Sequence, residues 1–565
     1  MATEKVLRSK RNKSEDKDSP KRERSERRKS KTNKICKGVF INILKSIYFL
    51  FRLYLDKLID FLFSLYWDEH RKAIPDLEER HSILKESAVS LAEKIRNKEL
   101  KSSDLVKACI ERIKQVNPFL NAVTDERYEA AIKEAKEVDE MIEKGVSDEE
   151  FKKKPFLGVP FTAKESHAVK GMLHTLGVRA RINERAEYDA ECVRLLRAAG
   201  AIPVAVTNVP EINKWQETRN MVFGQTNNPY HTGHTTGGSS GGEAALSAAL
   251  ASPISLCSDI GGSTRMPAFF CGLFGLNPTA GHTSLKGSAL RSGLDPTIAS
   301  IGFISKHCED LVPLTKIVAG DQAHLLNLDR EVNVKDLKFF YVEGVKDMRI
   351  SPINSDMKKA MNKVVLKLTH EADSTDKVPK AYYHKGFNHC LALWRHAMTK
   401  ETESFASLLT NNAGKANGLV ELAKKLVGQS DFTFAAILKL LDEQVMPQID
   451  VAWAEKLTES LKDDLVQTLG TDGVLLFPSA PSPAPTHYAL YLRIFNFALW
   501  GVFNALKFPA AQVPLGLNSE GLPLGIQVVA APRQDALCAA VAKHLETQFG
   551  GYVPPCNINE SQKGK

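Results

Sequence analysis

The sequence predicts an α/β protein in which helices cover both faces of a mostly parallel or mixed sheet, an α/β/α sandwich preceded by a membrane-associated N-terminal helix. Short apolar runs alternate with helical stretches along the chain, and such alternation typically builds a layered α/β fold. With 565 residues, of which 43% are hydrophobic, the chain is long enough to bury a large core. An apolar segment that follows a basic tail predicts the membrane helix.

Residues 1–37 form a basic tail that we predict to be disordered. The formal net charge of the chain is +9, and the net charge of this tail alone is also +9. The tail has almost no apolar residues that could be buried in a core. Its charge indicates either attraction to anionic lipid head groups or nuclear localisation and nucleic-acid binding. The sequence has no nucleic-acid motif, so we expect no nucleic-acid partner.

Residues 38–68 are predicted to form a membrane-anchor helix, either transmembrane or lying in the plane of the membrane. The segment is rich in Phe, Leu, Ile and Tyr, but Lys45, Arg52 and further charged residues interrupt it. A span needs about 20 residues with few charges, whereas most polar residues here share one helical face. An in-plane helix therefore fits slightly better. Nine scattered cysteines without a C-x-x-C pair favour a reducing compartment, so we predict an intracellular membrane.

Apolar runs and periodicity predict the remaining elements. Ser87 to Val138 indicates successive amphipathic helices with a cap at Ser102-Ser-Asp-Leu105. Phe432–Leu441 is either a core helix or a membrane-facing cap, and the aromatic-rich stretch Tyr488–Phe503 is either core or the lining of an acyl channel. Five runs predict strands: Gly158–Ala163, Pro203–Thr207, Leu337–Val342, Val474–Pro478 and Gly525–Ala530.

Two glycine-rich loops, each containing a serine, are the most informative feature of the chain. Ser239 lies in Gly237-Gly-Ser-Ser-Gly-Gly242, and Ser263 follows Asp259-Ile-Gly-Gly262. Clustered glycines indicate either a required positive φ or a close approach to the backbone. An acyl-transfer site needs an exposed hydroxyl and a cluster of backbone N–H groups that face a developing oxyanion.

Lys164 ends a strand-like apolar run that begins at Leu157. A lysine at the edge of a buried sheet loses hydration, which lowers its pKa, and a neutral lysine is a base. A proton relay from Ser263 through Ser239 to Lys164 would therefore need no histidine and no metal. A lysine at a strand end is more often solvated, and only the two serine loops favour the catalytic interpretation.

Together these features resemble the amidase signature family of serine hydrolases. The resemblance rests on Lys164, on the two serine loops, and on Arg265 and Pro267 after the second loop. It implies one amidase domain over residues 80–555, folded as a single large α/β/α sandwich with a mixed sheet. Within the family, Gly224-Gln-Thr-Asn-Asn-Pro-Tyr230, Arg265-Met-Pro-Ala-Phe-Phe270 and the apolar N-terminal segment are similar to the fatty-acid amide hydrolases.

The resemblance also implies roles for individual residues. Ser263 would be the nucleophile, Ser239 a bridging serine held by a cis peptide bond, and Lys164 the terminal base. Asp259 and Arg265 are expected to shape the loop as a buried ion pair or as hydrogen-bond donors. No cofactor and no metal is implied. The oxyanion hole would consist of the backbone N–H groups of Ile260, Gly261, Gly262 and Ser263.

Two other kinds of site fit part of the pattern. Gly237-Gly-Ser-Ser-Gly241 matches the nucleophile elbow of α/β-hydrolases, but an elbow follows a hydrophobic strand, and residues 231–236 are a loop by composition. A phosphate loop needs Gly-Lys-Ser/Thr after its glycines, and this chain has Glu243 there. His234 and His282 have no triad-like or metal-like neighbours and are predicted to be ordinary loop histidines.

The sequence and the resemblance predict a membrane-associated serine hydrolase that cleaves fatty-acid amides to a fatty acid and an amine or ammonia through an acyl-enzyme. The expected partners are a lipid amide substrate and a membrane, and a homo-oligomer stays open. One alternative is an amidase of another substrate class, acting on small soluble carboxamides or resembling an amidotransferase subunit. The membrane segment argues against it, because lipid amides partition into bilayers. The other alternative is a catalytically silent lipid-binding scaffold, against which the intact Lys164, Ser239 and Ser263 argue.

Overall fold

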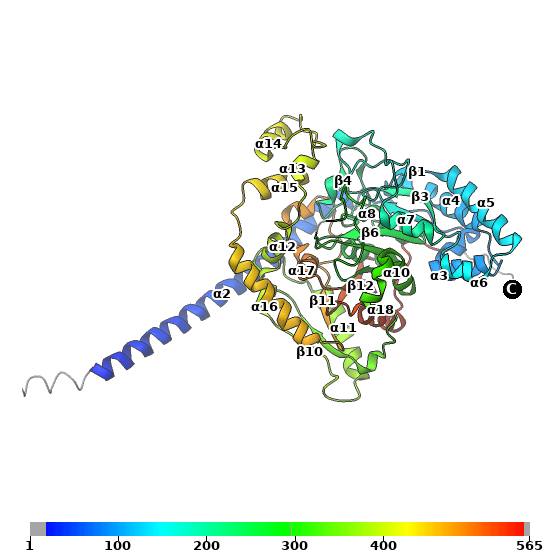
Figure 1. Ribbon diagram of the computed structural model, residues 1–565. Helices are drawn as coiled ribbons and strands as arrows, with labels where there is room; N and C mark the ends of the chain where they lie inside the picture. Colours follow the sequence, from blue (N-terminus) through cyan, green and yellow to red (C-terminus); the bar gives the residue numbers. More distant parts are fainter. Residues whose placement is uncertain (1–18, 295, 559–565) are drawn as a thin grey trace, which may run out of the picture. The chain divides into compact units, whose positions relative to one another are not determined.

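One mixed sheet of 11 strands organises residues 59–565 of the computed structural model (Figure 1). The structure describes residues 19–294 and 296–558, and the chain divides into two units, residues 1–58 and 59–565. The sheet has the order β1-β3-β2-β6-β8-β7-β12-β13-β11-β9-β10. Its strands are β1 (Val123–Glu126), β2 (Pro160–Lys164), β3 (Ile202–Thr207), β6 (Ile254–Asp259), β7 (Phe274–Asn277), β8 (Ser300–Ser305), β9 (Lys338–Tyr341), β10 (Lys380–Ala381), β11 (Gly473–Pro478), β12 (Ala510–Leu517) and β13 (Pro523–Ala530); β4 (Arg219–Asn220) and β5 (Gly224–Gln225) form a separate pair.

The mixed sheet that the sequence predicts is confirmed. Strand β2 pairs in parallel with β3 and β6, and β9 pairs in parallel with β10 and β11. All other pairs in the sheet are antiparallel. The five predicted runs correspond to β2, β3, β9, β11 and β13.

Helices follow most of the strands, as the alternation in the sequence predicts. The helices of the larger unit after α2 are α3 (Ala88–Arg96), α4 (Ser102–Leu120), α5 (Tyr128–Lys144), α6 (Asp148–Lys153), α7 (Glu191–Ala198), α8 (Gly241–Ala248), α9 (Arg265–Phe270), α10 (Leu311–Ala319), α11 (Ser355–Glu371), α12 (Cys390–Met398), α13 (Phe405–Leu408), α14 (Gly418–Leu426), α15 (Phe434–Gln444), α16 (Val451–Leu469), α17 (Ala498–Leu506) and α18 (Asp535–Phe549).

Helix α4 begins where its predicted cap lies, but another residue supplies the capping group. Ser102 is the first residue of the helix, and its side chain donates to the Gly158 carbonyl at 2.7 Å. The Asp139 carboxylate of α5 accepts instead from the N–H groups of Ser102 (2.7 Å) and Ser103 (3.2 Å). A carboxylate from a neighbouring helix therefore does what a local serine was predicted to do, which agrees with the preference of a helix N-terminus for negative charge.

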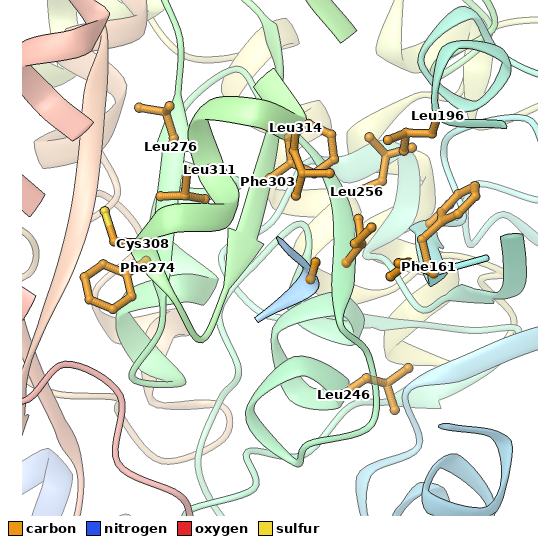
Figure 2. Close-up of a cluster of buried hydrophobic side chains, with 14 of the residues drawn as sticks. Phe161, Leu196, Leu246, Leu256, Phe274, Leu276, Phe303, Cys308, Leu311 and Leu314 are labelled. Carbon is orange, nitrogen blue, oxygen red and sulfur yellow. The ribbon is translucent and has the colours of Figure 1, made fainter. Parts of the chain in front are cut away.

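Strand β2 carries the core on one face and the site on the other, because successive side chains of a strand point to opposite faces. Phe161 is buried with Leu256 of β6 and Phe303 of β8, under Leu196 of α7 and Leu314 of α10 (Figure 2). The alternate residues of β2, Thr162 and Lys164, point to the other face, where Thr162 Oγ1 donates to Glu243 of α8 at 2.6 Å. The buried core thus fixes the direction in which Lys164 points.

Helix α2 (Ser19–Trp67, blue in Figure 1) is continuous across the predicted anchor segment. It begins within the tail that we predicted to be disordered, which agrees with the high helix propensity of Lys, Arg and Glu; residues 1–18 lie outside the described residues. In the part of the chain that the structure describes, no helix has a stretch both long and apolar enough to cross a membrane.

The helical region between β9 and β11 contributes a separate small core. Helices α13, α14 and α15 lie together at the top of Figure 1. Phe405, Leu409, Ile437 and Leu440 of this region pack with Leu176 in a cluster of their own. Residues 432–441 are therefore mostly a core helix, which was one of the two predicted interpretations.

Candidate active site

Lys164 ends strand β2 and lies directly beneath the first serine loop. Only 1% of its surface is exposed. Its Nζ atom lies 2.7 Å from Ser239 Oγ and 3.2 Å from Ser258 Oγ. Burial lowers the pKa of Lys164 to about 8, although acidic groups, Asp259 among them, act in the opposite direction. Because burial disfavours the ammonium form, a substantial fraction of Lys164 is neutral near physiological pH.

Ser239 lies in the first loop, after a peptide bond with Gly238 that is cis, as the resemblance implies. Its side chain is fully buried. The loop packs against the backbone of residues 215–217, and a Cβ at Gly238 would overlap the Trp215 carbonyl oxygen. The glycine here therefore permits a close backbone approach, as the sequence predicts.

Ser263 lies in the second loop, between β6 and α9, and is 8% exposed. The two loops touch, because the Ser240 N–H donates to the Ser263 carbonyl at 3.2 Å. Within the described residues, no hydrogen bond joins the hydroxyls of Ser239 and Ser263, although both serines line one cavity. Contacts of this kind are often long without a substrate. The structure thus brings Lys164, Ser239 and Ser263 to one place.

Two cavities meet at Ser263. The first, of about 110 Å³, is lined by the loop residues Gly261 and Ser263 and by an apolar wall. The second, of about 90 Å³, contains Lys164, Ser239 and Ser258 together with several charged side chains. The apolar wall of the first cavity consists of Trp215, Met266, Leu391, Trp394, Leu438, Ile494, Phe495 and Phe497.

The backbone of the second loop offers N–H groups to these cavities, with one difference from the prediction. In the described residues, the N–H groups of Ile260, Gly261 and Ser263 have no hydrogen-bond acceptor. The fourth predicted donor, Gly262, instead donates to Asp259 Oδ1 at 2.7 Å. Its φ of 108° favours glycine, and a Cβ there would overlap the Trp500 side chain. The loop therefore presents three free donors, not four.

A buried ion pair holds this loop. Asp259 and Arg265 are both fully buried, and Arg265 Nη2 lies 3.1 Å from Asp259 Oδ1. Burial by itself would raise the pKa of Asp259, but the Arg265 guanidinium and the hydrogen bonds to the carboxylate lower it. Arg265 also donates to Gln527 at 2.7 Å and to Asn504 at 2.6 Å. Asp259 and Arg265 thus support the loop, and within the described residues the side chains of both form no hydrogen bond with Ser239 or Ser263.

The structure also shows residues that sequence reasoning did not single out. Ser258 is the second hydroxyl that Lys164 contacts, at 3.2 Å. In the sequence, only its position next to the second serine loop could have indicated that it belongs to the site. Trp394 of α12 donates from Nε1 to the Ile260 carbonyl at 2.9 Å and so orients the donor loop. Lys214 lines both cavities. Trp394 and Lys214 come from segments that carry no motif.

His234 and His282 were predicted to be ordinary loop histidines. His234 Nδ1 contacts the Ala484 carbonyl at 2.6 Å, His282 Nδ1 contacts Gln322 at 3.0 Å, and neither histidine is among the residues lining the two cavities. Asp68, His231 and His234 form the one group within the described residues whose spacing suits a metal. His234 therefore has metal-like neighbours, contrary to the prediction, with His231 Nε2 3.1 Å from Asp68 and His231 Nδ1 accepting from the Gly233 N–H at 3.1 Å.

The chain is similar to known proteins over most of its length. A family profile described as Amidase matches residues 104–539. Fatty-acid amide hydrolase 2 of Homo sapiens is 41% identical over 481 residues, which cover 83% of this chain and 90% of that protein. Fatty-acid amide hydrolase 2-A of Danio rerio is 39% identical over 505 residues, which cover 87% of this chain and 94% of that protein. These matches confirm the family that the serine loops predicted.

The fold is also found among solved structures. The structure of 6-aminohexanoate cyclic dimer hydrolase complexed with substrate matches with a TM-score of 0.67 and 22% sequence identity, covering 82% of this chain and 97% of that chain. At this identity the match supports the fold alone.

We expect Lys164→Ala to lower kcat/KM for amide hydrolysis by about 10²–10⁴-fold, the typical contribution of a general base. In the wild-type protein a protonated Lys164 accepts no proton, so activity should rise with pH towards a pKa of about 8 and fall on acidification below it. Steady-state kinetics across a pH series measure both effects.

Lys306→Met is the matched control for this experiment. Burial also lowers the pKa of Lys306 to about 8, but Lys306 lines neither cavity, so the pH profile should stay as in the wild type once thermal unfolding shows that the variant is folded. Equal losses in the two variants, or a wild-type profile that is flat through pH 8, would contradict the role of Lys164.

We expect Arg265→Met to lower the free energy of unfolding by about 3–5 kcal/mol, because the change leaves the Asp259 carboxylate buried without its counter-charge. Chemical denaturation measures this loss. Arg179→Met is the control, since the Arg179–Asp431 pair is exposed at 51% and 65% and such pairs contribute at most about 1 kcal/mol. Similar losses in both variants would mean that the buried pair does not hold the loop.

Proposed function

The chain belongs to the amidase family, and we propose that it is a membrane-associated serine hydrolase that cleaves fatty-acid amides to a fatty acid and an amine or ammonia. The observation that carries the proposal is the 2.7 Å contact between Lys164 Nζ and Ser239 Oγ, in a buried cavity that also contains Ser263. A base, a bridging hydroxyl and a second hydroxyl beside free N–H groups are the parts that acyl transfer needs.

Acylation begins when Ser263 Oγ attacks the amide carbonyl. Ser239 takes the proton of Ser263 and passes its own proton to neutral Lys164 across the 2.7 Å contact. The negative charge that develops on the carbonyl oxygen is stabilised by the free N–H groups of Ile260, Gly261 and Ser263, which are fixed in place before the reaction.

Collapse of the tetrahedral intermediate breaks the C–N bond. The leaving nitrogen needs a proton, and the relay runs in reverse, from Lys164 through Ser239 to the nitrogen. The amine leaves and the acyl group stays as an ester on Ser263. A water molecule then attacks this ester with the same relay as base, which releases the carboxylic acid and restores Ser263.

The lining of the apolar cavity supports an apolar acyl group. Its wall is made of aromatic and aliphatic side chains, and Ile494, Phe495 and Phe497 come from the aromatic-rich stretch that was predicted to be either core or an acyl channel. Other members of the stretch, Trp500 and Phe503, are buried in the core. The relatives at about 40% identity are named as fatty-acid amide hydrolases, which supports the same substrate class here.

We place the membrane contact on one face of α2. Apolar residues recur every three or four positions along it and are mostly exposed, which is the pattern of an amphipathic helix. A helix of this kind lies in the interface with its apolar face in the lipid. The exposed residues with this spacing are Phe40, Leu44, Ile47, Phe51, Tyr54, Leu58, Phe61 and Leu65.

The proposed substrate class predicts a dependence on acyl length. Across primary amides of increasing chain length, kcat/KM should rise by about fourfold for each CH₂ buried in the apolar cavity, until the chain fills it, because each buried CH₂ contributes about 0.8 kcal/mol. Ser263→Ala should hydrolyse none of the series. The highest activity on acetamide or another short amide would contradict the lipid assignment and favour an amidase of soluble substrates.

The proposed attachment predicts that charges on one face of α2 release the protein from membranes. Phe51→Glu combined with Leu58→Glu should abolish co-flotation with phosphatidylcholine vesicles that contain phosphatidylserine. Asn42→Glu combined with Ser46→Glu adds the same charge to exposed polar positions of the same helix and should reduce flotation much less. Unchanged flotation of the first variant would contradict the attachment.

A further inference from the structure

The two cavities at Ser263 receive different halves of an amide. This argument rests on the proposed function. The leaving nitrogen must take its proton from Ser239, so the amine half has to lie in the cavity that Ser239 lines, together with Lys164 and Ser258. The acyl half then occupies the other, apolar cavity, whose described lining includes Ser263 but neither Ser239 nor Lys164. We call these the amine cavity and the acyl cavity.

The acids of the amine cavity are paired with cations. Arg291 lies 2.8 Å from Glu401 and 2.6 Å from Glu403, so one guanidinium serves both carboxylates. Glu443 lies 3.3 Å from Lys439. These acids are therefore occupied and are poorly placed to bind a cationic amine.

Lys214 differs from these paired acids because it lacks a partner of opposite charge within the described residues. In the part of the chain that the structure describes, no hydrogen bond or ion pair joins its ammonium to another residue, yet it lines both cavities where they meet. Its side chain keeps some accessible surface, but it lies deep enough that burial lowers its pKa to about 8. After burial, the cations Arg291 and Lys439 lower this pKa, and Glu403 and Glu401 raise it. Lys214 thus brings to the two cavities an ammonium with which no carboxylate of the described residues forms an ion pair, and such a charge attracts an anion.

The backbone before Lys214 is held in an unusual conformation. Ile212 and Asn213 have φ values of 50° and 60°, which a β-branched residue such as isoleucine rarely adopts. The loop is pinned on both sides, because the Ile212 N–H donates to the Leu176 carbonyl at 2.9 Å and the Lys214 N–H donates to the Glu211 carbonyl at 3.1 Å. Strain of this kind persists where the surrounding structure enforces it and is concentrated at functional sites. In this conformation the loop places Lys214, which has no ion-pair partner within the described residues, in the two cavities that Ser263 also lines.

We propose that Lys214 is a specificity residue that binds a carboxylate on the leaving amine, and that the preferred substrates are long-chain N-acyl amino acids. The carboxylate of the amino-acid half pairs with the Lys214 ammonium in the amine cavity. Ser263 attacks the acyl carbonyl, the C–N bond breaks, and the nitrogen takes its proton from Ser239. Water then releases the fatty acid from Ser263, so the products are a fatty acid and a free amino acid.

The test compares two substrates that differ in one charge, N-oleoylglycine and N-oleoylglycinamide, with release of oleate as the readout. In the wild-type protein, kcat/KM should be about tenfold or more higher for N-oleoylglycine, because a charge-assisted hydrogen bond is made with that substrate alone. Lys214→Met should bring the ratio of the two values close to one. Lys214→Glu should favour N-oleoylethylenediamine, which carries a cation at the same position.

Two controls keep the test decisive. Lys415→Met, at an exposed lysine between α13 and α14, should keep the wild-type ratio, and Lys214→Arg should keep the preference for the anion. Labelling by a fluorophosphonate shows that each variant retains a competent Ser263. If Lys214→Met is not labelled, the comparison of Lys214→Glu with Lys214→Arg still shows whether the charge at position 214 sets the preference between an anionic and a cationic substrate.

The outcomes separate this inference from the proposed function. Hydrolysis of oleamide with equal kcat/KM for the two glycine substrates in the wild type would overturn the inference and leave the proposed function standing. A wild-type preference for N-oleoylglycine that persists in Lys214→Met would also overturn it. Absence of hydrolysis on oleamide and on all the N-acyl substrates would overturn the proposed function itself.

Discussion

The burial of one lysine ammonium beneath two serine loops is the constraint on which the site depends. Strand β2 is covered on both faces, so Lys164 cannot reach bulk water, and loss of hydration brings its pKa to about 8. The serine hydroxyl at 2.7 Å is then both its hydrogen-bond partner and its route to the reacting atoms. A histidine is unnecessary in such a site, because desolvation alone brings a strong base into the physiological range.

The second constraint is the rigidity of the loop that bears Ser263. Asp259 accepts from the N–H groups of Gly262 and Thr264 and pairs with Arg265, which in turn reaches Asn504 and Gln527 in the C-terminal part of the chain. Donors fixed in this way face a developing charge without reorganising during the reaction. The ion pair is wholly buried, and a buried pair of this kind is weak evidence for stability by itself; here its partners are what fix the shape of the loop.

The sequence predicted what is local and missed what depends on distant contacts. Glycine clusters and the lysine at a strand end indicated Lys164, Ser239 and Ser263, and apolar runs indicated five strands of the mixed sheet. The family resemblance implies Gly262 as a fourth oxyanion donor, and only the structure shows that its N–H donates to Asp259. Trp394 and Lys214 carry no motif, since their places at the site come from tertiary packing. Helix α2 begins at Ser19, inside the tail that we predicted to be disordered. A composition rich in Lys, Arg and Glu indicates disorder, but the same residues have a high helix propensity.

In the proposed reaction, Ser263 carries the acyl group and Ser239 only relays protons. The most direct measurement traps the wild-type protein during turnover of a slow long-chain amide and locates the acyl group by peptide mass spectrometry. We expect one acyl group, on Ser263, and none in Lys164→Ala within the time that acylates the wild type. An acyl group on Ser239 would contradict it, because the first loop would then supply the nucleophile.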